Sequence, residues 1–481
     1  MRAWRVIRLC GLAAVVAGVL WALAAGAPSA RSGAPAPRPN VLLVSIDSLR
    51  ADHLGSYGYA RDTSPAIDAL AREGVLFENA ISSAPWTVPA HMTLLTALPP
   101  EVHDVVTIRQ QLSPDAVTLA EVLQAAGWET AAFVSGPTVM AHFGFDQGFA
   151  LYDESTVEVS PKKIGDVVTS PGLVDLVNGW LGRWSDAGRR APFFVFLHMW
   201  DVHYDYVPPP EYVRRFDPDY TGDVDTRHFE TNPRLHRDMD PRDLAHVIAL
   251  YDGEIRFTDD HLARIFAELR VLGALDDTIV VVTSDHGEEF FEHGQKGHAK
   301  TLYEEVLRVP LVVRYPRRIA AGRRVAEPVR LMDVAPTILG LAGVAPPDGF
   351  GTHALDAAHR AADLTPYVAG RSPAPMPALA AFSANRWLGG RQSAVRTADA
   401  KLVRHDKPLP NRPPVEVFDL ARDPAERENL AATAAAPPLL ATLDPLLDAW
   451  QADAGRQTKL ALARKPGAQH EARLRALGYV E

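Results

Sequence analysis

Short apolar runs alternate with amphipathic stretches along the first two thirds of the chain. The runs "NVLLVSI", "ETAAFVS", "PFFVFLH" and "DTIVVVTS" are mainly β-branched or aromatic, as buried strands are. Residues 64–74, 115–127 and about 241–272 instead carry apolar positions three and four apart, the pattern of amphipathic helices. Strands that alternate with helices predict an α/β fold with a doubly wound, mostly parallel sheet covered by helices on both faces.

The pattern changes near residue 373. The segments "ALAAFS", "QSAVRTADAKLVRH" and "VEVFDL" predict short strands joined by turns, and "PLLATLDPLLDAWQAD" predicts a helix. We therefore expect a main domain over residues 40–372 and a smaller α+β subdomain with an antiparallel sheet over residues 373–481. Residues 204–240 are rich in Pro, Arg and Asp with little periodicity, and a loop of this length predicts a lid over a functional site.

The N-terminus has the pattern of a secretory signal. Three arginines precede an apolar run that ends in small residues, which predicts a signal peptide over residues 1–26 and a flexible tether over residues 27–39. An uncleaved N-terminal membrane anchor is the alternative. In both cases the rest of the chain is exported, so we expect a periplasmic or extracellular protein. Cys10, the only cysteine, lies in this segment, so a processed chain has neither a disulfide nor a thiolate ligand.

Composition narrows the class of partner. Of the 481 residues, 47% are hydrophobic and 22% are charged, which is ordinary for a soluble enzyme-sized protein. The net charge of −10 argues against a nucleic-acid partner, because such proteins present basic surfaces to phosphates. A small anionic substrate stays compatible with this charge, since local fields outweigh distant, screened charges.

Polar residues stand where three predicted strands end. Asp47 ends the first strand, Asp285 and His286 follow "TIVVVTS", and His198 ends "FFVFL" with His203 close behind. In open α/β sheets, ligands bind beyond the carboxyl ends of the strands. Two carboxylates and an imidazole at one edge therefore predict a site for one divalent cation. Oxygen ligands favour Ca²⁺ or Mg²⁺ and the imidazole favours Mn²⁺ or Zn²⁺; we favour Ca²⁺ or Mn²⁺, with Mg²⁺ and Zn²⁺ as alternatives.

A threonine precedes a predicted helix in "SAPWTVPAHMTLL". Because proline is tolerated only in the first turn of a helix, Pro89 places Thr87 at the amino end, where free N–H groups favour negative charge. A hydroxyl held there by a cation is a credible nucleophile, which predicts that Thr87 joins Asp47, Asp285 and His286 as a metal ligand. Taken alone, the same threonine is also a favoured helix N-cap.

Several motifs occur in an order that resembles the sulfatase family of the alkaline phosphatase superfamily. They are "NVLLVSIDSLRADHLGSYGY", "PWTVPAHMTLLTALPPEVH", "FLHMWDVHYDY", "TSDHGEEFFEHGQKGHAKTLYEE" and "EVFDLARDPAERENLA". The resemblance covers most of the chain after residue 39. It implies an alkaline phosphatase-like fold, a metal at the strand edge, for which Ca²⁺ is the sulfatase precedent, and hydrolysis of sulfate or phosphate esters.

The resemblance also assigns roles to individual residues. Asp47, Asp285 and His286 match metal residues, and His203 matches the histidine that holds the substrate oxyanion. Lys300 lies one position from the usual sulfatase lysine, and His298 is the alternative for it. We assign catalytic roles to Thr87, His203 and His198, and substrate-binding roles to His91, Lys300 and His298. A second metal at His203 and His298 is a further alternative.

The departures from the sulfatase pattern carry equal weight. Thr87 stands where these enzymes have the Cys or Ser that is oxidised to formylglycine, and oxidation of a threonine gives a ketone, so formylglycine cannot form. His91 replaces the motif's arginine, Ser48 replaces a second carboxylate, and the lysine–x–histidine motif is absent from "FVSGPTV". These departures resemble the superfamily branch in which a metal-bound threonine attacks phosphorus.

We therefore expect an exported, metal-dependent hydrolase that cleaves sulfate or phosphate esters without formylglycine. Its expected substrates are small-molecule, glycan or lipid esters. One alternative is a phosphotransferase or phosphodiesterase that acts on cell-envelope material. The other is a catalytically silent exported binding protein that keeps the fold.

Overall fold

The computed structural model describes residues 38–157, 168–351, 355–369, 376–388, 390–406 and 412–476. The predicted signal peptide and all but the last two residues of the predicted tether lie outside these ranges. No helix within the described ranges is long and apolar enough to cross a membrane. From Pro39 onward the chain forms one compact unit.

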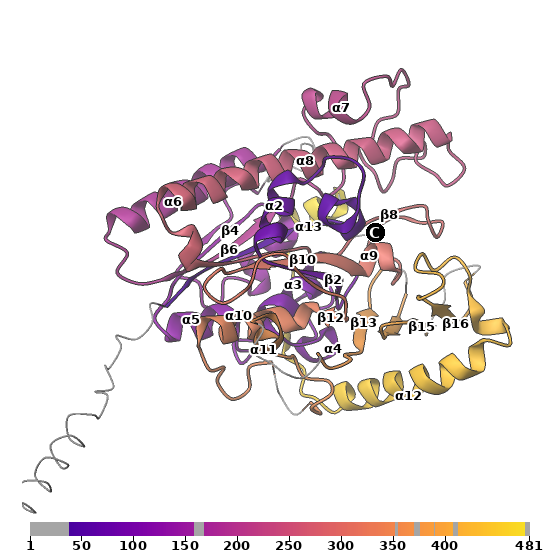
Figure 1. Cartoon of the computed structure of the whole chain (residues 1–481). Helices are drawn as coiled ribbons and strands as arrows, with labels where there is room; N and C mark the ends of the chain where they lie inside the picture. Colours follow the sequence, from indigo (N-terminus) through magenta and orange to yellow (C-terminus); the bar gives the residue numbers. More distant parts are fainter. Residues whose placement is uncertain are drawn as a thin grey trace, which may run out of the picture. The chain divides into compact units, whose positions relative to one another are not determined.

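A nine-stranded mixed sheet runs through this unit in the order β11-β2-β10-β7-β1-β6-β4-β5, with β12 beside β2 (Figure 1). The strands are β1 (Asn40–Ile46), β2 (Val75–Ile81), β4 (Glu129–Val134), β5 (Leu151–Asp153), β6 (Phe193–Met199), β7 (Thr278–Thr283), β10 (Arg308–Arg314), β11 (Arg323–Val325) and β12 (Val329–Arg330). Only β10 runs antiparallel to its neighbours β2 and β7; the other pairs are parallel. The predicted mostly parallel α/β sheet is therefore confirmed.

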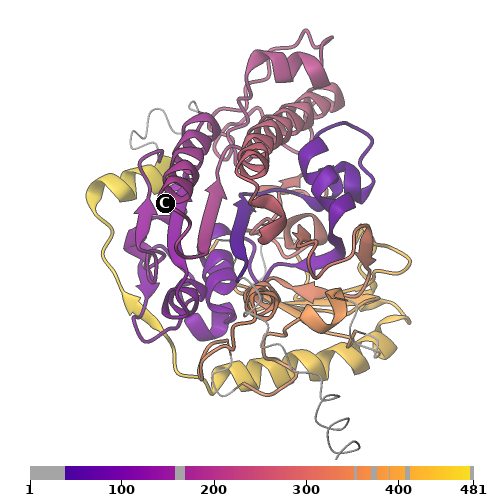
Figure 2. The same cartoon turned by 60° about the vertical axis from the view of Figure 1, so that its left-hand side comes forward.

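Helices cover both faces of this sheet (Figures 1 and 2). Successive side chains of β1 point to opposite faces, as in any strand, so Leu42 and Val44 pack into one core while Val41 and Leu43 pack into the other. The first core contains α2 (Pro65–Glu73), α6 (Ser170–Asp186) and α8 (Pro241–Val271). The second contains α3 (Thr87–Thr96), α5 (Leu119–Ala125) and α10 (Val334–Ala342).

A separate antiparallel sheet lies near the C-terminus. It consists of β13 (Ala381–Asn385), β14 (Gln392–Arg396), β15 (Ala400–His405) and β16 (Val415–Asp419). One face packs on α12 (Ala436–Gly455) through Leu443, Leu447 and Trp450, and the other packs on Leu302 and Tyr303 of the main domain. The predicted small antiparallel sheet is confirmed, whereas the domain boundary at residue 373 falls outside the described residues and stays a prediction.

The remaining elements are short. They are β3 (Gln110–Leu112), β8 (Glu289–Phe290), β9 (Lys296–Gly297), β17 (Ala461–Ala463), α4 (Pro100–His103), α7 (Pro210–Phe216), α9 (Glu304–Leu307), α11 (Thr365–Val368) and α13 (Ala468–Ala476). Helix α7 lies in the predicted lid 204–240, whose closing role stays a prediction.

Candidate active site

The strand register brings the polar strand ends together. Strand β1 lies between β6 and β7, and Ser45 pairs with His198 on one side and with Thr283 on the other. Asp47 comes two residues after Ser45, and Asp285 comes two residues after Thr283. Both aspartates therefore lie at the same edge of the sheet. Both carboxylates are completely buried. This arrangement follows from the fold alone, because parallel neighbours end on the same side.

Ser48 ties the two carboxylates to each other. Its backbone has a left-handed φ of 57°, which turns the chain sharply after the strand. The Ser48 amide donates to Asp285 Oδ1 at 3.2 Å, and the Ser48 hydroxyl donates to Asp47 Oδ1 at 2.9 Å. The serine that replaces a second carboxylate is thus a hydrogen-bond donor between the two carboxylates that remain.

The ring of His286 is oriented by its own backbone. Its Nδ1 donates to the carbonyl of Gly287 at 2.9 Å, which leaves Nε2 as the nitrogen that faces the carboxylates. Nε2 lies 3.2 Å from Asp285 Oδ2 and 3.8 Å from Asp47 Oδ1. Such fixing of one ring nitrogen by a carbonyl is the usual preparation of a histidine for metal binding.

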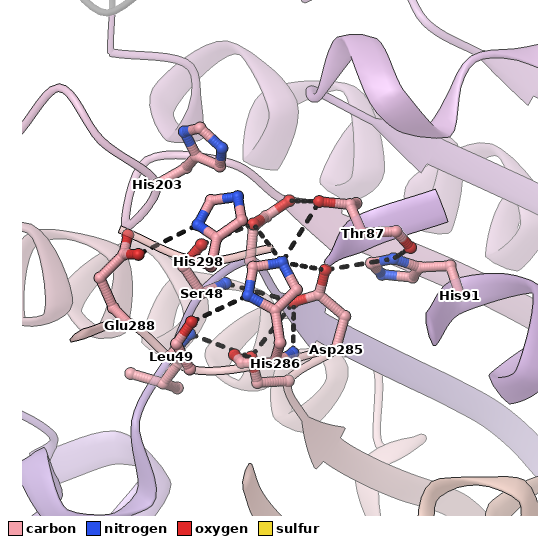
Figure 3. A network of polar contacts seen from close by, with 12 residues as sticks. Ser48, Leu49, Thr87, His91, His203, Asp285, His286, Glu288 and His298 are labelled. Atoms are coloured by element: carbon pink, nitrogen blue, oxygen red, sulfur yellow. Dashed lines mark hydrogen bonds and ion pairs between the residues drawn. The ribbon is translucent and has the colours of Figure 1, made fainter. Parts of the chain in front are cut away.

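Thr87 points its hydroxyl into this cluster (Figure 3). It is the first residue of α3, and the N-cap residue is Trp86, which makes no side-chain cap. Thr87 Oγ1 lies 3.3 Å from His286 Nε2 and 3.5 Å from Asp47 Oδ2. Because Trp86 stands at the N-cap position and the Thr87 hydroxyl contacts the cluster, the geometry gives the N-cap alternative no support, and the role of Thr87 as a ligand stays a prediction.

The cluster has the properties of a divalent-cation site. Asp47, Asp285 and His286 each offer one ligand atom, and these atoms lie within 4.8 Å of one another. Asp285 Oδ2 is buried and accepts no hydrogen bond of good geometry; the nitrogens near it are His286 Nε2 at 3.2 Å and His91 Nδ1 at 3.5 Å, so the oxygen keeps lone pairs for a cation. Two carboxylates, an imidazole and a hydroxyl form a donor set that suits Ca²⁺, Mg²⁺, Mn²⁺ or Zn²⁺. The residues present therefore fit a metal ion.

The electrostatics of the cluster also favour a positive charge. Burial, together with the charge of Asp285, raises the pKa of Asp47 to about 6. Burial opposes ionisation of Asp285 too, but His286 and His91 outweigh it and hold the pKa of that carboxyl below its usual range. Burial opposes a charged imidazole at His286, yet the two carboxylates raise its pKa to about 9. Two buried carboxylates thus compete for positive charge, which a bound cation would supply.

His198 lies against Asp47. Its Nε2 is 3.1 Å from Asp47 Oδ2, and burial lowers the pKa of this imidazole to about 4. The ring fits because residue 136 is glycine: a Cβ there would come within 2.6 Å of His198 Cε1 and of the Trp200 ring. The loop that lacks the lysine–x–histidine motif thus leaves room for a histidine from the neighbouring strand.

His91 lies between Thr87 and the first strand of the sheet. Its Nδ1 donates to the carbonyl of Thr87 at 3.0 Å, and its Nε2 lies 2.9 Å from the hydroxyl of Ser45. Both ring nitrogens are therefore engaged by protein groups, and the ring is completely buried. The ring thus contacts Thr87 and the adjacent strand, and a role of His91 in substrate binding stays a prediction.

His203 and His298 lie on the side of the cluster away from His91 (Figure 3). His203 stacks on Trp200 with ring centroids 3.7 Å apart, and burial lowers its pKa to about 4. The ring of His298 lies 4.3 Å from His286 and 4.9 Å from His203. Within the described residues, neither ring belongs to a group of three potential ligands, so the second-metal alternative gains no support.

Lys300 is engaged by the predicted lid. Its Nζ forms an ion pair with Glu230, and it donates to the carbonyl of Lys296 at 2.8 Å. Lys296 in turn donates to two lid carbonyls, those of Asn232 and Leu235. The two lysines hold the lid against the segment that carries His298, and a role of Lys300 in substrate binding stays a prediction.

Sequence reasoning missed Glu288. This carboxylate is completely buried, accepts a hydrogen bond from the Tyr206 hydroxyl at 2.8 Å and lies 3.0 Å from His298 Nδ1. The available signal was its place two residues after His286, in the same strand-end motif. Its partners could not be recognised from that motif, because Tyr206 lies 82 positions away.

Comparison with known proteins gives a consistent picture. A family model described as "Sulfatase" matches residues 39–344. The chain is 26% identical over 336 residues to the ulvan-active sulfatase of Formosa agariphila, covering 65% of this chain and 63% of that protein. It is 24% identical over 481 residues to the N-acetylglucosamine-6-O-sulfatase of Bacteroides thetaiotaomicron, covering 82% of each. It thus spans less than two thirds of the first relative's length.

The solved phosphonate monoester hydrolase of Agrobacterium radiobacter has the same fold. The two structures superpose with a TM-score of 0.70 at 24% sequence identity, over 89% of this chain and 100% of that one. At this identity the likeness concerns the fold, and it agrees with the alkaline phosphatase-like architecture predicted from the motifs.

Proposed function

Because this chain belongs to the sulfatase family of hydrolases, we propose that it is an exported, metal-dependent enzyme that cleaves sulfate or phosphate esters with Thr87 as its nucleophile. The observation that carries this proposal is the place of the Thr87 hydroxyl, 3.5 Å from Asp47 Oδ2 and 3.3 Å from His286 Nε2. Export rests on the signal pattern of residues 1–26, and an N-terminal membrane tether is its variant.

The metal would be held by Asp47, Asp285 and His286, with Thr87 as the fourth protein ligand. When bound, a divalent cation supplies Lewis-acid chemistry: it favours the ionised hydroxyl and neutralises charge on the ester oxygens. We favour Ca²⁺ or Mn²⁺. Ser48 and the Gly287 carbonyl hold Asp47, Asp285 and His286 in place, as the groups behind metal ligands commonly do.

Thr87 performs the first step. Its Oγ1 gives its proton towards Asp47 Oδ2 and forms a bond to the sulfur or phosphorus of the ester, while the bond from that atom to the ester oxygen breaks. The equatorial oxygens would lie at the amino end of α3, where the helix dipole favours negative charge. Water then attacks the same atom, the bond to Thr87 Oγ1 breaks, and the hydroxyl is restored.

His203 protonates or binds the leaving oxygen in this scheme. It lies on the side of the cluster away from His91, and its stack on Trp200 fixes its ring plane. His198, the other residue assigned to this role from sequence, lies 3.1 Å from Asp47 Oδ2. That position supports a role in orienting Asp47.

An ester of phosphorus is the second candidate for the substrate. Thr87 cannot become formylglycine, and His91 occupies the motif's arginine position with both ring nitrogens engaged by protein groups. Both features support a threonine-based displacement, and the reaction would then be that of a phosphodiesterase or phosphotransferase on small-molecule, glycan or lipid esters. The same site residues can act on sulfur or on phosphorus, because sulfate and phosphate esters both react by displacement at a tetrahedral centre that carries charged oxygens.

A substrate panel tests the proposal. We would assay para-nitrophenyl sulfate, para-nitrophenyl phosphate, bis(para-nitrophenyl) phosphate and para-nitrophenyl phenylphosphonate, each with Ca²⁺, Mn²⁺, Mg²⁺ and Zn²⁺. We expect metal-dependent turnover of at least one ester and its loss in Thr87→Ala. Turnover that survives in Thr87→Ala would overturn the nucleophile, and binding of metal and oxyanion without turnover of any ester would favour the silent binding protein.

A further inference from the structure

The segment that leads into the nucleophile is attached to the C-terminal sheet. Strand β13 is an edge strand of that sheet, and its outer edge faces Ser82 and Ser83. The Ala384 amide donates to the carbonyl of Ser83 at 3.0 Å, and the Ser383 hydroxyl donates to the carbonyl of Ser82 at 2.6 Å. Amides on the edge of a sheet otherwise have no strand to pair with, so the sheet is closed here by the chain just before Thr87.

Ala299 makes a second link between the same two parts. Its amide donates to the carbonyl of Pro85 at 2.8 Å, two residues before Thr87, and its carbonyl accepts a hydrogen bond from Asn385 Nδ2 at 2.7 Å. Asn385 is the last residue of β13, and both Ala299 and Asn385 are buried. The C-terminal sheet thus reaches the chain beside the nucleophile through one residue whose two backbone groups are both engaged.

The backbone of Ala299 is held in an unfavourable conformation. Its φ is 64°, in the left-handed region that residues with a Cβ rarely adopt. Such a conformation persists only where the surrounding contacts outweigh its cost, and residues of this kind cluster at functional sites. At Ala299 those contacts are the hydrogen bonds to Pro85 and Asn385. The strained link indicates that the distance between the nucleophile segment and the C-terminal sheet is specified by the fold.

Two further contacts extend the link. The ring of Trp387, two residues after β13, lies 4.2 Å from the ring of Trp86, the residue before Thr87. The side-chain amide of Gln392, on β14, donates to the carbonyl of Lys300 at 2.7 Å. Trp86 and Gln392 are both buried. The contacts therefore run without a break from the C-terminal sheet to the residue before the nucleophile.

We propose that Ser383 and Asn385 are positioning residues for the nucleophile, and that they fix the chain before Thr87 so that its hydroxyl meets the ester in line. The proposal rests on the proposed function, because it assumes that Thr87 attacks the ester. It makes the C-terminal sheet part of the catalytic unit, although the carboxylates and the imidazole of the metal cluster come from the main domain. A misplacement of an attacking atom by about 1 Å is enough to lower a rate roughly 100-fold while the substrate still binds.

Two variants remove the link one hydrogen bond at a time. Asn385→Ala removes the donor to Ala299, and Ser383→Ala removes the donor to Ser82. With the metal and the para-nitrophenyl ester that the wild type cleaves fastest, kcat should fall roughly 100-fold in Asn385→Ala and roughly tenfold in Ser383→Ala, with KM within about threefold of the wild type. Ser383→Thr keeps the hydroxyl and should recover most of kcat.

Asn429→Ala is the matched control. The Asn429 side chain also bonds to the backbone of the C-terminal sheet, but at the opposite edge: its Oδ1 accepts from the amides of Val417, on β16, and Ala431, at 3.0 Å each. The variant should unfold at a lower urea concentration than the wild type and keep kcat within about twofold.

Inhibition by vanadate separates positioning from general loosening of the site. Orthovanadate binds as a trigonal-bipyramidal mimic of the transition state, with the attacking oxygen as one of its ligands, whereas inorganic phosphate resembles the ground state. The inhibition constant for vanadate should therefore rise in step with the loss of kcat in Asn385→Ala, while the constant for phosphate stays within about threefold. A merely structural role would move both constants equally or neither.

Each result decides the proposal. Unchanged kcat in Asn385→Ala and Ser383→Ala would overturn it, as would an equal loss of kcat in Asn429→Ala or an equal rise of both inhibition constants. Because Ser383→Ala is a mild change, it keeps the test decisive if Asn385→Ala does not fold. Wild-type turnover that is absent or independent of Thr87 would overturn the proposed function too, whereas turnover that depends on Thr87 but not on Asn385 would overturn this proposal alone.

Discussion

Thr87 Oγ1 lies 3.3 Å from Nε2 of His286, although the two residues are 199 positions apart in the chain. The contact exists because α3 starts at the edge of the sheet where β1 and β7 end, so that a helix N-terminus faces two strand-end motifs. The hydroxyl therefore belongs to a group of buried carboxylate and imidazole side chains. This relationship underlies the predictions that follow.

Removal of the Thr87 hydroxyl should abolish turnover while leaving the fold intact. We expect Thr87→Ala to lower kcat roughly a thousand-fold or more, because loss of a nucleophile removes the reaction path. Thr87→Ser should keep measurable activity, since it retains a primary hydroxyl at the same place. Steady-state kinetics on the best ester of the panel measures both.

Thr93→Ala is the matched control for that experiment. Thr93 lies on the same helix and is equally buried, but its hydroxyl contacts His103. If this variant lost as much activity as Thr87→Ala, the loss would reflect damage to α3 and not the absence of a nucleophile.

Asp285→Asn should weaken metal binding. Asp285 Oδ2 is a completely buried carboxylate oxygen beside His286 Nε2, and an amide in its place supplies no charge to a cation. We expect the Kd for Ca²⁺ or Mn²⁺ to rise at least about a hundred-fold, by calorimetric titration of protein stripped with a chelator. Asp356, His359 and Asp453 form a second group of possible ligands in which Asp356 is exposed. Asp356→Asn is the control and should leave the Kd unchanged. An unchanged Kd in Asp285→Asn would place the cation elsewhere.

Metal removal should lower thermal stability as well as activity. A ligand present at about 100 times its Kd adds about 2.7 kcal/mol to the free energy of unfolding. Stripped protein should therefore melt several degrees lower and recover its Tm when the metal is returned. In Asp285→Asn the same addition should give a much smaller shift, and an equal shift in both proteins would contradict the assigned site.

A buried ion pair joins the C-terminal sheet to the main domain. Lys401 on β15 is completely buried and bonds to Glu304 Oε1 at 3.1 Å and Glu426 Oε1 at 3.0 Å. Lys401→Ala removes the buried cation from Glu426 and leaves Glu304 with Arg396, so we expect a loss of about 3–5 kcal/mol in the free energy of unfolding. Arg404→Ala, three residues along the same strand in more exposed pairs with Asp444 and Asp448, should lose less than about 1 kcal/mol in urea unfolding.

The free energy of unfolding should fall as the pH rises, because His293, which lies away from the metal cluster, loses its proton. Burial opposes a charged His293, but the bonds to Glu305 at 2.6 Å and to the carbonyl of Glu426 at 3.0 Å raise its pKa to about 9. The folded pKa lies above the unfolded value of about 6.5, so this stabilisation is complete below about pH 6.5 and is lost as the pH rises through about 9.

His293→Gln measures that contribution. The variant should be less stable than the wild type by roughly 1–2 kcal/mol near pH 6, and the difference should shrink towards zero above about pH 9.5. Urea unfolding at the two pH values gives the comparison. A difference that stays constant with pH would show that the ring acts only through packing on Tyr303, with which it stacks at 3.7 Å.

The sequence was sufficient for features that depend on local pattern and on the rule for strand ends. The buried runs became β1, β4, β6 and β7, and the residues Asp47, Asp285 and His286 met at one edge because parallel strands end together. The predicted helix at about residues 241–272 agrees with α8. Thr87 could be placed because a proline two residues later restricts where a helix begins.

Features that depend on distant partners could not be predicted. Ser64 stands at the N-cap of α2, but its side chain makes no cap, because Asp259 from α8 accepts the amides of Ala66 and Ile67 instead. The segment predicted as a helix over residues 115–127 is helical only over Leu119–Ala125, after the capping box at Thr118.

The same limit applies within the site. The place of His91 depends on Ser45, 46 positions away, and that of Lys300 on Glu230, 70 positions away. Neither contact leaves a signal in the motif that suggested substrate binding. Residue type and spacing predicted which side chains gather, but tertiary contacts decide which atom of each side chain remains for the reaction.

The most direct test of the account is the mass of the peptide that contains Thr87 after acid quench of a turnover reaction with the metal and the best ester of the panel. The account predicts an added sulfo or phospho group on Thr87 in the wild type, absent without metal. A group found on another residue, or undiminished turnover in Thr87→Ala with no added group, would contradict it.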